Sequence, residues 1–207
     1  DMANKNYVLV EAPVRGLLVD VGTMGESGIS TVHVPLVGVM PIGSSGAPIA
    51  AYRSTVALTR TADTNAYAAN DVLGAATGST AALTFANVAP SGGGHVLLTG
   101  LSILIESTGV ISGETSYTLH LYTVTPPSAL GDNAAWDLPS GDRASYIGGF
   151  SIGTPVDLGS TLYVRTDQIN AQIYAASSSI FGYLVTVGAY TPTSARVYNV
   201  TMRTVGL

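Results

Sequence analysis

Residues 115–124 read TSYTLHLYTV, and the alternation within them decides the fold class. Tyr117, Leu119 and Leu121 fall on one face of an extended strand, and the residues between and after them fall on the other. A repeat of two is typical of a half-buried β-strand, whereas a helix repeats every 3.6 residues. The stretch therefore predicts a strand with one face in a hydrophobic core.

The same alternation recurs along most of the chain, most clearly at 95–107 (HVLLTGLSILIES) and 197–205 (VYNVTMRTV). Further strands are predicted at 52–60, 71–75, 80–88, 145–152, 161–166, 171–176 and 179–188. Turn-forming clusters separate them, at 90–94, 112–114, 154–160 and 190–194. Because helical spacing is nearly missing, a parallel α/β fold lacks its crossover helices and is excluded. We predict an all-β fold, a jelly-roll-like antiparallel β-sandwich over residues 51–207.

Residues 1–50 differ from the rest, being apolar, rich in Gly and Pro, and only weakly alternating. Two interpretations stay open: extra hairpins that pack on the sandwich, or an extended arm whose strands pair with a neighbouring subunit by strand addition. In the second, 28–40 would supply the main strand and GSSGAP at 43–48 the hinge. The predicted interface side chains are Leu17, Val19, Val21, Val32, Val34, Leu36 and Val39.

Composition excludes several classes of partner. Only 10% of the 207 residues are charged, against about 25% in ordinary globular domains. The net charge is −5 and the eight Lys and Arg residues are scattered, which argues against a nucleic-acid partner. Without cysteine there are no disulfides and no thiolate metal sites. Glycines and prolines interrupt every long uncharged stretch, so no membrane segment is predicted.

The segment 125–153 holds the only tryptophan and concentrates oxygen-bearing side chains, which are Asp132, Asn133, Asp137 and Asp142. Such groups are calcium ligands, but their spacing does not fit an EF-hand loop. The alternative is a capped connection, in which Asp132 caps a short helical turn at 133–136 and Asp142 pairs with Arg143. The capped loop is favoured, no metal site is assigned, and the four residues stay as weak metal candidates.

Catalytic patterns are missing from the sequence. The histidines, His33, His95 and His120, are far apart, and GSSG at 43–46 precedes no helix as a nucleophile elbow would. No pair of carboxylates has a spacing that indicates glycoside hydrolysis. We therefore predict no catalytic residue, no cofactor and no enzymatic activity.

Tyrosine is over-represented, with eleven against one Trp and three Phe. Tyrosine is enriched at binding surfaces, but it also suits half-buried strands. The candidates for an interface or a sugar site are Tyr122, Tyr146, Tyr174, Tyr190 and Tyr198. As surface-binding aromatics we single out Trp136, Tyr146 and Tyr190.

Residues 52–207 contain TADTNAYAANDVLG at 61–74 and PPSALGDNAAWDLPSGDRASYIG at 126–148. With these motifs the chain resembles a group of tailed-bacteriophage virion structural proteins. The resemblance implies a non-enzymatic part of the particle, a capsid decoration protein, with tail-associated positions left open. No catalytic residue carries over.

The predicted role is a homotrimer on the capsid exterior that clamps neighbouring subunits of the major capsid protein. Low charge suits such contacts, because few charged groups lose their hydration. The alternative prediction is a host-glycan or receptor-binding module on the tail or capsid surface. Trp136, with Asp137 or Asp132 beside it, would form its aromatic platform.

Overall fold

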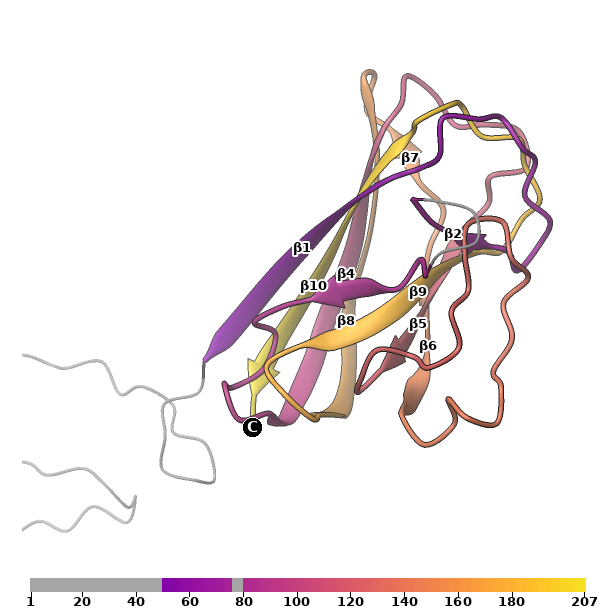
Figure 1. Ribbon diagram of the computed structural model, residues 1–207. Helices are drawn as coiled ribbons and strands as arrows, with labels where there is room; N and C mark the ends of the chain where they lie inside the picture. Colours follow the sequence, from indigo (N-terminus) through magenta and orange to yellow (C-terminus); the bar gives the residue numbers. More distant parts are fainter. Residues whose placement is uncertain (1–49, 76–79) are drawn as a thin grey trace, which may run out of the picture. The chain divides into compact units, whose positions relative to one another are not determined.

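A computed structural model describes residues 50–75 and 80–207 of the protein (Figure 1). The predicted interface residues Leu17 to Val39 and the hinge at 43–48 lie outside the described residues. The described part contains ten strands and no helix. The strands are β1 (Ala51–Thr59), β2 (Val72–Leu73), β3 (Leu83–Phe85), β4 (Gly94–Glu106), β5 (Tyr117–Tyr122), β6 (Tyr146–Ile152), β7 (Val156–Asp157), β8 (Thr161–Ala175), β9 (Ile180–Thr186) and β10 (Val197–Gly206).

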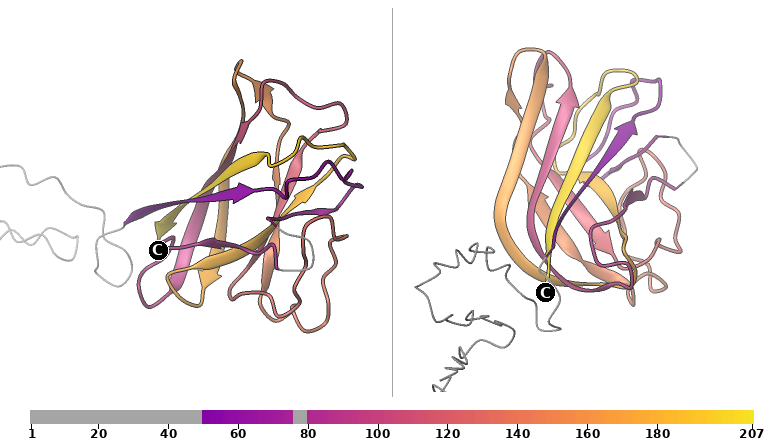
Figure 2. Two further views of the ribbon diagram at one scale, coloured as in Figure 1. Left: turned by 45° about the horizontal axis from the view of Figure 1, so that its top comes forward. Right: turned by 90° about the vertical axis from the view of Figure 1, so that its left-hand side faces the viewer.

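Two antiparallel sheets face each other (Figure 2). The first sheet has the order β1-β10-β4-β8-β7, and the second has β2-β9-β5-β6, with β3 also pairing with β9. The pairing is nested: β1 pairs with β10, β2 with β9, β4 with β8 and β5 with β6. The first half of the chain thus pairs with the second half in reverse order, as in a long hairpin folded over on itself. The eight strands in these four pairs have the arrangement of a jelly roll, and β3 and β7 are short additions to it. The predicted fold class is therefore confirmed.

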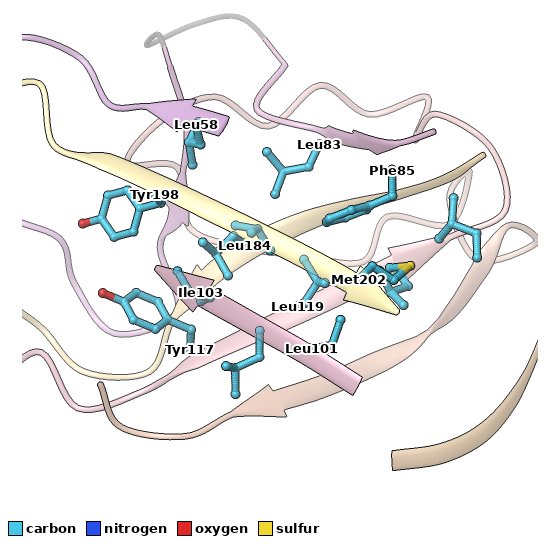
Figure 3. Close-up of a cluster of buried hydrophobic side chains, with 14 of the residues drawn as sticks. Leu58, Leu83, Phe85, Leu101, Ile103, Tyr117, Leu119, Leu184, Tyr198 and Met202 are labelled. Atoms are coloured by element: carbon cyan, nitrogen blue, oxygen red, sulfur yellow. The ribbon is translucent and has the colours of Figure 1, made fainter. Parts of the chain in front are cut away.

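The core lies between the inner faces of the sheets (Figure 3). Leu101 and Ile103 of β4, Leu119 of β5, Leu184 of β9 and Met202 of β10 are all fully buried in it. The inner face predicted for 117–121 is confirmed, because Tyr117 and Leu121 are fully buried too. Burying one such aliphatic side chain contributes about 1.5–3 kcal/mol.

Strand β8 is longer than the sequence analysis predicts. The predicted strands 161–166 and 171–176 are one strand of 15 residues. Gln168 and Asn170 have φ values of 58° and 50°, and the register with β4 shifts nearby, between Leu98 and Gly100. The irregularity interrupts the alternation without ending the strand. The predicted turn at 154–160 also contains the short strand β7.

The long connection between β5 and β6, residues 123–145, is fixed by backbone hydrogen bonds to the segment around β2. The Val72 amide donates to the Ala134 carbonyl, and the Asn133 amide donates back to the Val72 carbonyl. The Trp136 amide donates to the Asn70 carbonyl. This connection therefore contacts β2 at the edge of the second sheet.

Candidate interaction surfaces

Asp132 lies at the centre of a buried polar network. Its carboxylate accepts hydrogen bonds from Thr61 Oγ1 at 2.7 Å, the Tyr67 hydroxyl at 2.5 Å and the Gly74 amide at 2.8 Å. The guanidinium of Arg60 lies 3.6 Å away, and both charged side chains are almost completely buried. No helical turn follows Asp132, so the predicted cap is wrong: the carboxylate is turned toward residues 60–74 because that segment supplies three donors.

The other oxygen-bearing residues of the loop point to separate places. Asp142 is buried and accepts a hydrogen bond from the Ser128 amide at 3.1 Å, and no ion pair joins it to Arg143. Asn133 and Asp137 are exposed. Within residues 50–75 and 80–207, no three His, Asp or Glu side chains are grouped so that they could hold a metal ion. The carboxylates of Asp132 and Asp142 therefore hold this loop in place through hydrogen bonds.

A second buried ion pair joins two other loops. Arg196 donates to the Glu114 carboxylate at 2.9 Å, and both side chains are 0% exposed. The Tyr117 hydroxyl donates to the same carboxylate. Burial raises the pKa of the Tyr117 hydroxyl well above its usual value, so it remains a donor. Sequence reasoning missed this pair, since 82 residues separate its members and nothing local indicates that they meet.

An aromatic cluster lies between the second sheet and the loop 123–145. The Trp136 indole stacks on the His120 imidazole, with ring centroids 3.6 Å apart and planes 16° apart. Nδ1 of His120 lies 3.0 Å from the Tyr146 hydroxyl. Burial lowers the pKa of His120 to about 4, so the ring is neutral at pH 7. Trp136 is half-buried and packs against a smaller hydrophobic cluster that includes Tyr122 and is separate from the main core. This packing anchors the loop.

Most tyrosines among the described residues are internal. Tyr190, predicted as a surface-binding residue, is 5% exposed, and its hydroxyl lies 3.1 Å from that of Tyr198, which is fully buried. This prediction is wrong because Tyr190 forms a backbone bridge with Tyr67 and its ring packs beside the Tyr67 ring in the core. Tyr146 is half-buried. Of the five candidate tyrosines, Tyr174 is the one that is exposed, with 52% of its surface accessible. Its ring centroid lies 5.3 Å from that of His95.

The outer face of the first sheet carries an uncharged row across all five strands, here called the outer row. Cross-strand neighbours place its members side by side, and they are Ala57, Asn199, Leu104, Tyr163 and Val156. Leu104 is 38% exposed and Val156 is 63% exposed. An uncharged row of this kind loses little charge hydration when another protein covers it.

No family model matches the chain, and no curated protein matches it. Among solved structures, it is similar to a chain in the cryo-electron microscopy structure of Mud Crab Dicistrovirus, with 9% identity and a TM-score of 0.31, covering 100% of this chain and 89% of that one. A chain of the Israeli acute paralysis virus full particle heated to 63 degrees has 11% identity and a TM-score of 0.27, covering 76% and 70%. The fold assignment rests on the strand pairing. No helix among the described residues is long and apolar enough to cross a membrane.

Proposed function

We propose that the protein is a non-enzymatic structural component of a virus particle and acts as a capsid decoration protein. The observation that carries the proposal is the outer row, which crosses five paired strands without a charged side chain. A hydrogen-bonded sheet holds this face in one shape before binding. Association then orders few side chains, and the row itself brings no charged group into the interface.

Two further observations support the proposal. Jelly rolls are common in viral capsid domains, although lectin domains use them as well, so this support is an analogy of fold. The motifs that carry the resemblance to phage virion proteins, 61–74 and 126–148, meet in space: Asp132 of the second binds Thr61, Tyr67 and Gly74 of the first. The most distinctive parts of the sequence therefore form one structural unit.

In the proposed assembly, homotrimers bind the exterior of the capsid. The outer row contacts the major capsid protein, and residues 17–42 reach a neighbouring subunit. Apolar and backbone groups are buried between subunits, which raises the resistance of the particle to internal pressure.

The outer row is tested with particles of the parent virus that lack this protein. Leu104→Arg places a charge in the middle of the row and should weaken binding to such particles at least tenfold. Val110→Arg is the matched control, because Val110 is 43% exposed but lies in the loop between β4 and β5. Sedimentation with labelled protein measures both. Equal binding by the two variants contradicts the role of the outer row.

The arm is tested separately by deleting residues 2–42. The deletion should abolish binding to undecorated capsids while the sandwich stays folded, as judged by circular dichroism. Unchanged binding would reject the role of the arm and leave the outer row as the only contact.

A host-glycan or receptor-binding module is the second candidate. It is favoured by the half-buried group of His120, Trp136 and Tyr146 beside the exposed Asp137. One face of the indole is already occupied by His120, so a sugar would have only the opposite face. A glycan array with wild type and Trp136→Ala decides this candidate: binding that the variant loses supports it, and no binding by either protein removes it.

A further inference from the structure

The positive charges of the described residues are concentrated on the outer face of the first sheet. Residues 50–75 and 80–207 contain six of the eight basic residues of the chain, and all six are arginines. Arg60 and Arg196 are buried beside carboxylates, and Arg143 lies in the loop between β5 and β6. The other three alternate with inward-facing residues and so lie on the outer face, and they are Arg53 of β1, Arg165 of β8 and Arg203 of β10.

Arg53 and Arg203 lie directly opposite each other across β1 and β10. At the end of the same ladder the Gly206 amide donates to the Ala50 carbonyl, so 50 and 206 form a hydrogen-bonded pair. The two kinds of pair alternate along an antiparallel ladder, and 53 with 203, three positions further along, is therefore a non-hydrogen-bonded pair. The Cα atoms of such a pair are about 4.5 Å apart, closer than in the other kind. The two guanidinium groups thus extend from adjacent points on one face.

This arrangement is unfavourable in the isolated protein, because like charges directly opposite each other destabilise a sheet. Neither Arg53 nor Arg203 forms an ion pair with another described residue. Arg203 donates one hydrogen bond to Ser102 Oγ at 3.2 Å, although a guanidinium has five donors. At the next pair of the same kind, the hydroxyl groups of Thr55 and Thr201 lie 2.9 Å apart, so this backbone geometry also accommodates a favourable pair.

The carboxylate nearest in the register belongs to Asp167 and is engaged by a different arginine. Gly100 is the neighbour of Arg203 on β4, and Asp167 is the neighbour of Gly100 on β8. Asp167 accepts a hydrogen bond from Arg165 Nε at 2.6 Å and forms no ion pair with Arg203. Three arginines therefore share one carboxylate on this part of the face, and the pair of Arg53 and Arg203 is not compensated by it.

Protection of the sheet edge explains only one of the two arginines. A charge on an edge strand discourages pairing with other chains, and β1 is an edge strand, so Arg53 has a role of this kind. Strand β10 is paired with β1 on one side and with β4 on the other, so Arg203 protects no edge. A bound anion gives both arginines one purpose, since it would remove the repulsion between them.

A carboxylate of a protein suits this pair better than a nucleic acid does. Arginine binds carboxylates through two parallel hydrogen bonds, and two adjacent guanidinium groups can hold one carboxylate between them. Nucleic-acid binding uses many phosphate contacts, and the net charge of this chain is −5. Arg53 is four residues along β1 from Ala57 of the outer row, a distance of about 13 Å. A protein interface of ordinary size, about 800 Å² per partner, includes both.

We propose that Arg53 and Arg203 bind the carboxylate of an aspartate or glutamate side chain of the protein that covers the outer row. The inference rests on the proposed function, in which that protein is the major capsid protein, and it names the chemistry of the contact beside the row. The repulsion between the two arginines is present in the free protein and is relieved in the complex. Binding is therefore favoured at this point and weakens as salt screens the contact.

Neutral variants measure the contribution of the pair to binding. Arg53→Gln and Arg203→Gln should each weaken binding of the full-length protein to particles of the parent virus that lack it about fivefold. The double variant should lose little more, because both arginines hold one carboxylate. Arg143→Gln removes an exposed arginine from the loop between β5 and β6 and is the matched control, with binding within about twofold of wild type. Urea midpoints of the two sheet variants should equal or exceed that of wild type, which excludes misfolding as the cause.

Cross-linking identifies the owner of the carboxylate, because Lys5 is the only lysine of the chain. Arg53→Lys, Arg203→Lys and, as the control, Arg143→Lys are each made together with Lys5→Arg. A carbodiimide then joins the new amine to a carboxylate in direct contact, with loss of water. On particles, the Arg53→Lys or Arg203→Lys protein should be linked to the major capsid protein in mass spectrometry, and the Arg143→Lys protein should not.

The outcomes separate this inference from the proposed function. If wild type binds the particles but the glutamine variants bind equally well, or if no cross-link to a particle protein forms, the inference alone is overturned. A cross-link within one chain or between two copies of it also overturns the inference, since the carboxylate then belongs to this protein. Failure of wild type to bind the particles overturns the proposed function together with the inference.

Discussion

Replacing Glu114 by glutamine should destabilise the sandwich more than most single substitutions. The change keeps the shape of the side chain and removes the charge that compensates Arg196, 2.9 Å away and 0% exposed. The Nε and Nη2 atoms of Arg196 have no hydrogen-bond partner among the described residues, and the Tyr198 hydroxyl lies 3.5 Å from Nη1. Few groups near the guanidinium could replace the lost charge.

The magnitude follows from the geometry of the pair. At 2.9 Å and an effective dielectric constant of about 20, the gross attraction is about 6 kcal/mol. Glutamine retains a polar acceptor and recovers part of it, and removing one partner of a buried pair costs about 3–5 kcal/mol. We expect the free energy of unfolding to fall by an amount in this range.

Urea unfolding followed by circular dichroism measures the loss. Asp167→Asn is the control: Asp167 pairs with Arg165 at 2.6 Å, but both side chains are about half exposed, so its effect should be near the error of the measurement. The double variant Glu114→Gln with Arg196→Met should recover at least half of the loss. The reasoning is refuted if Glu114→Gln costs less than about 1 kcal/mol, or no more than the control.

Three further predictions concern single residues. The pKa of His120, about 4 when folded, lies below its unfolded value of about 6.5, so the unfolded chain binds more protons between these values. Stability should therefore fall by about 2 kcal/mol as the pH drops from 6.5 to 4, and urea midpoints of His120→Phe should lack this fall. Asp132→Asn should cost about 3 kcal/mol in calorimetry while the exposed Asp137→Asn changes little; similar losses would contradict the network. Gly113→Ala, at a φ of 91° and with a new Cβ 2.1 Å from a backbone carbonyl oxygen, should lower the yield of folded protein, whereas Gly109→Ala, with no atom within 4 Å, should not.

The sandwich could be predicted from the sequence because alternation is a local property. At Tyr117, Leu119 and Leu121 the inner face is visible in the residue types themselves. Around Gln168 the same reasoning failed, since two residues with positive φ shift the alternation inside one continuous strand. Local patterns therefore locate strands well, but they do not show that a bulge lies within a single strand.

The polar interior could not be predicted for a different reason. Arg60 and Arg196 are buried, although both sit in segments rich in turn-forming residues. Their burial depends on carboxylates at Asp132 and Glu114, which are distant in the sequence. The burial of Tyr190, which was predicted to lie on the surface, likewise depends on a distant residue, Tyr67. Such contacts depend on how loops meet at one end of the sandwich, and a single sequence does not record it.

The pairing of β1 with β10 has a consequence for synthesis. Thr55 and Thr201 are 146 positions apart, yet their hydroxyl groups lie 2.9 Å from each other. While the chain emerges from the ribosome, β1 stays unpaired until β10, its only described partner, has been synthesised after all the other strands. Closing so distant a contact is slow. During this interval both sides of β1 are unpaired, so crowding of nascent chains on one messenger RNA would favour contacts between molecules at this strand.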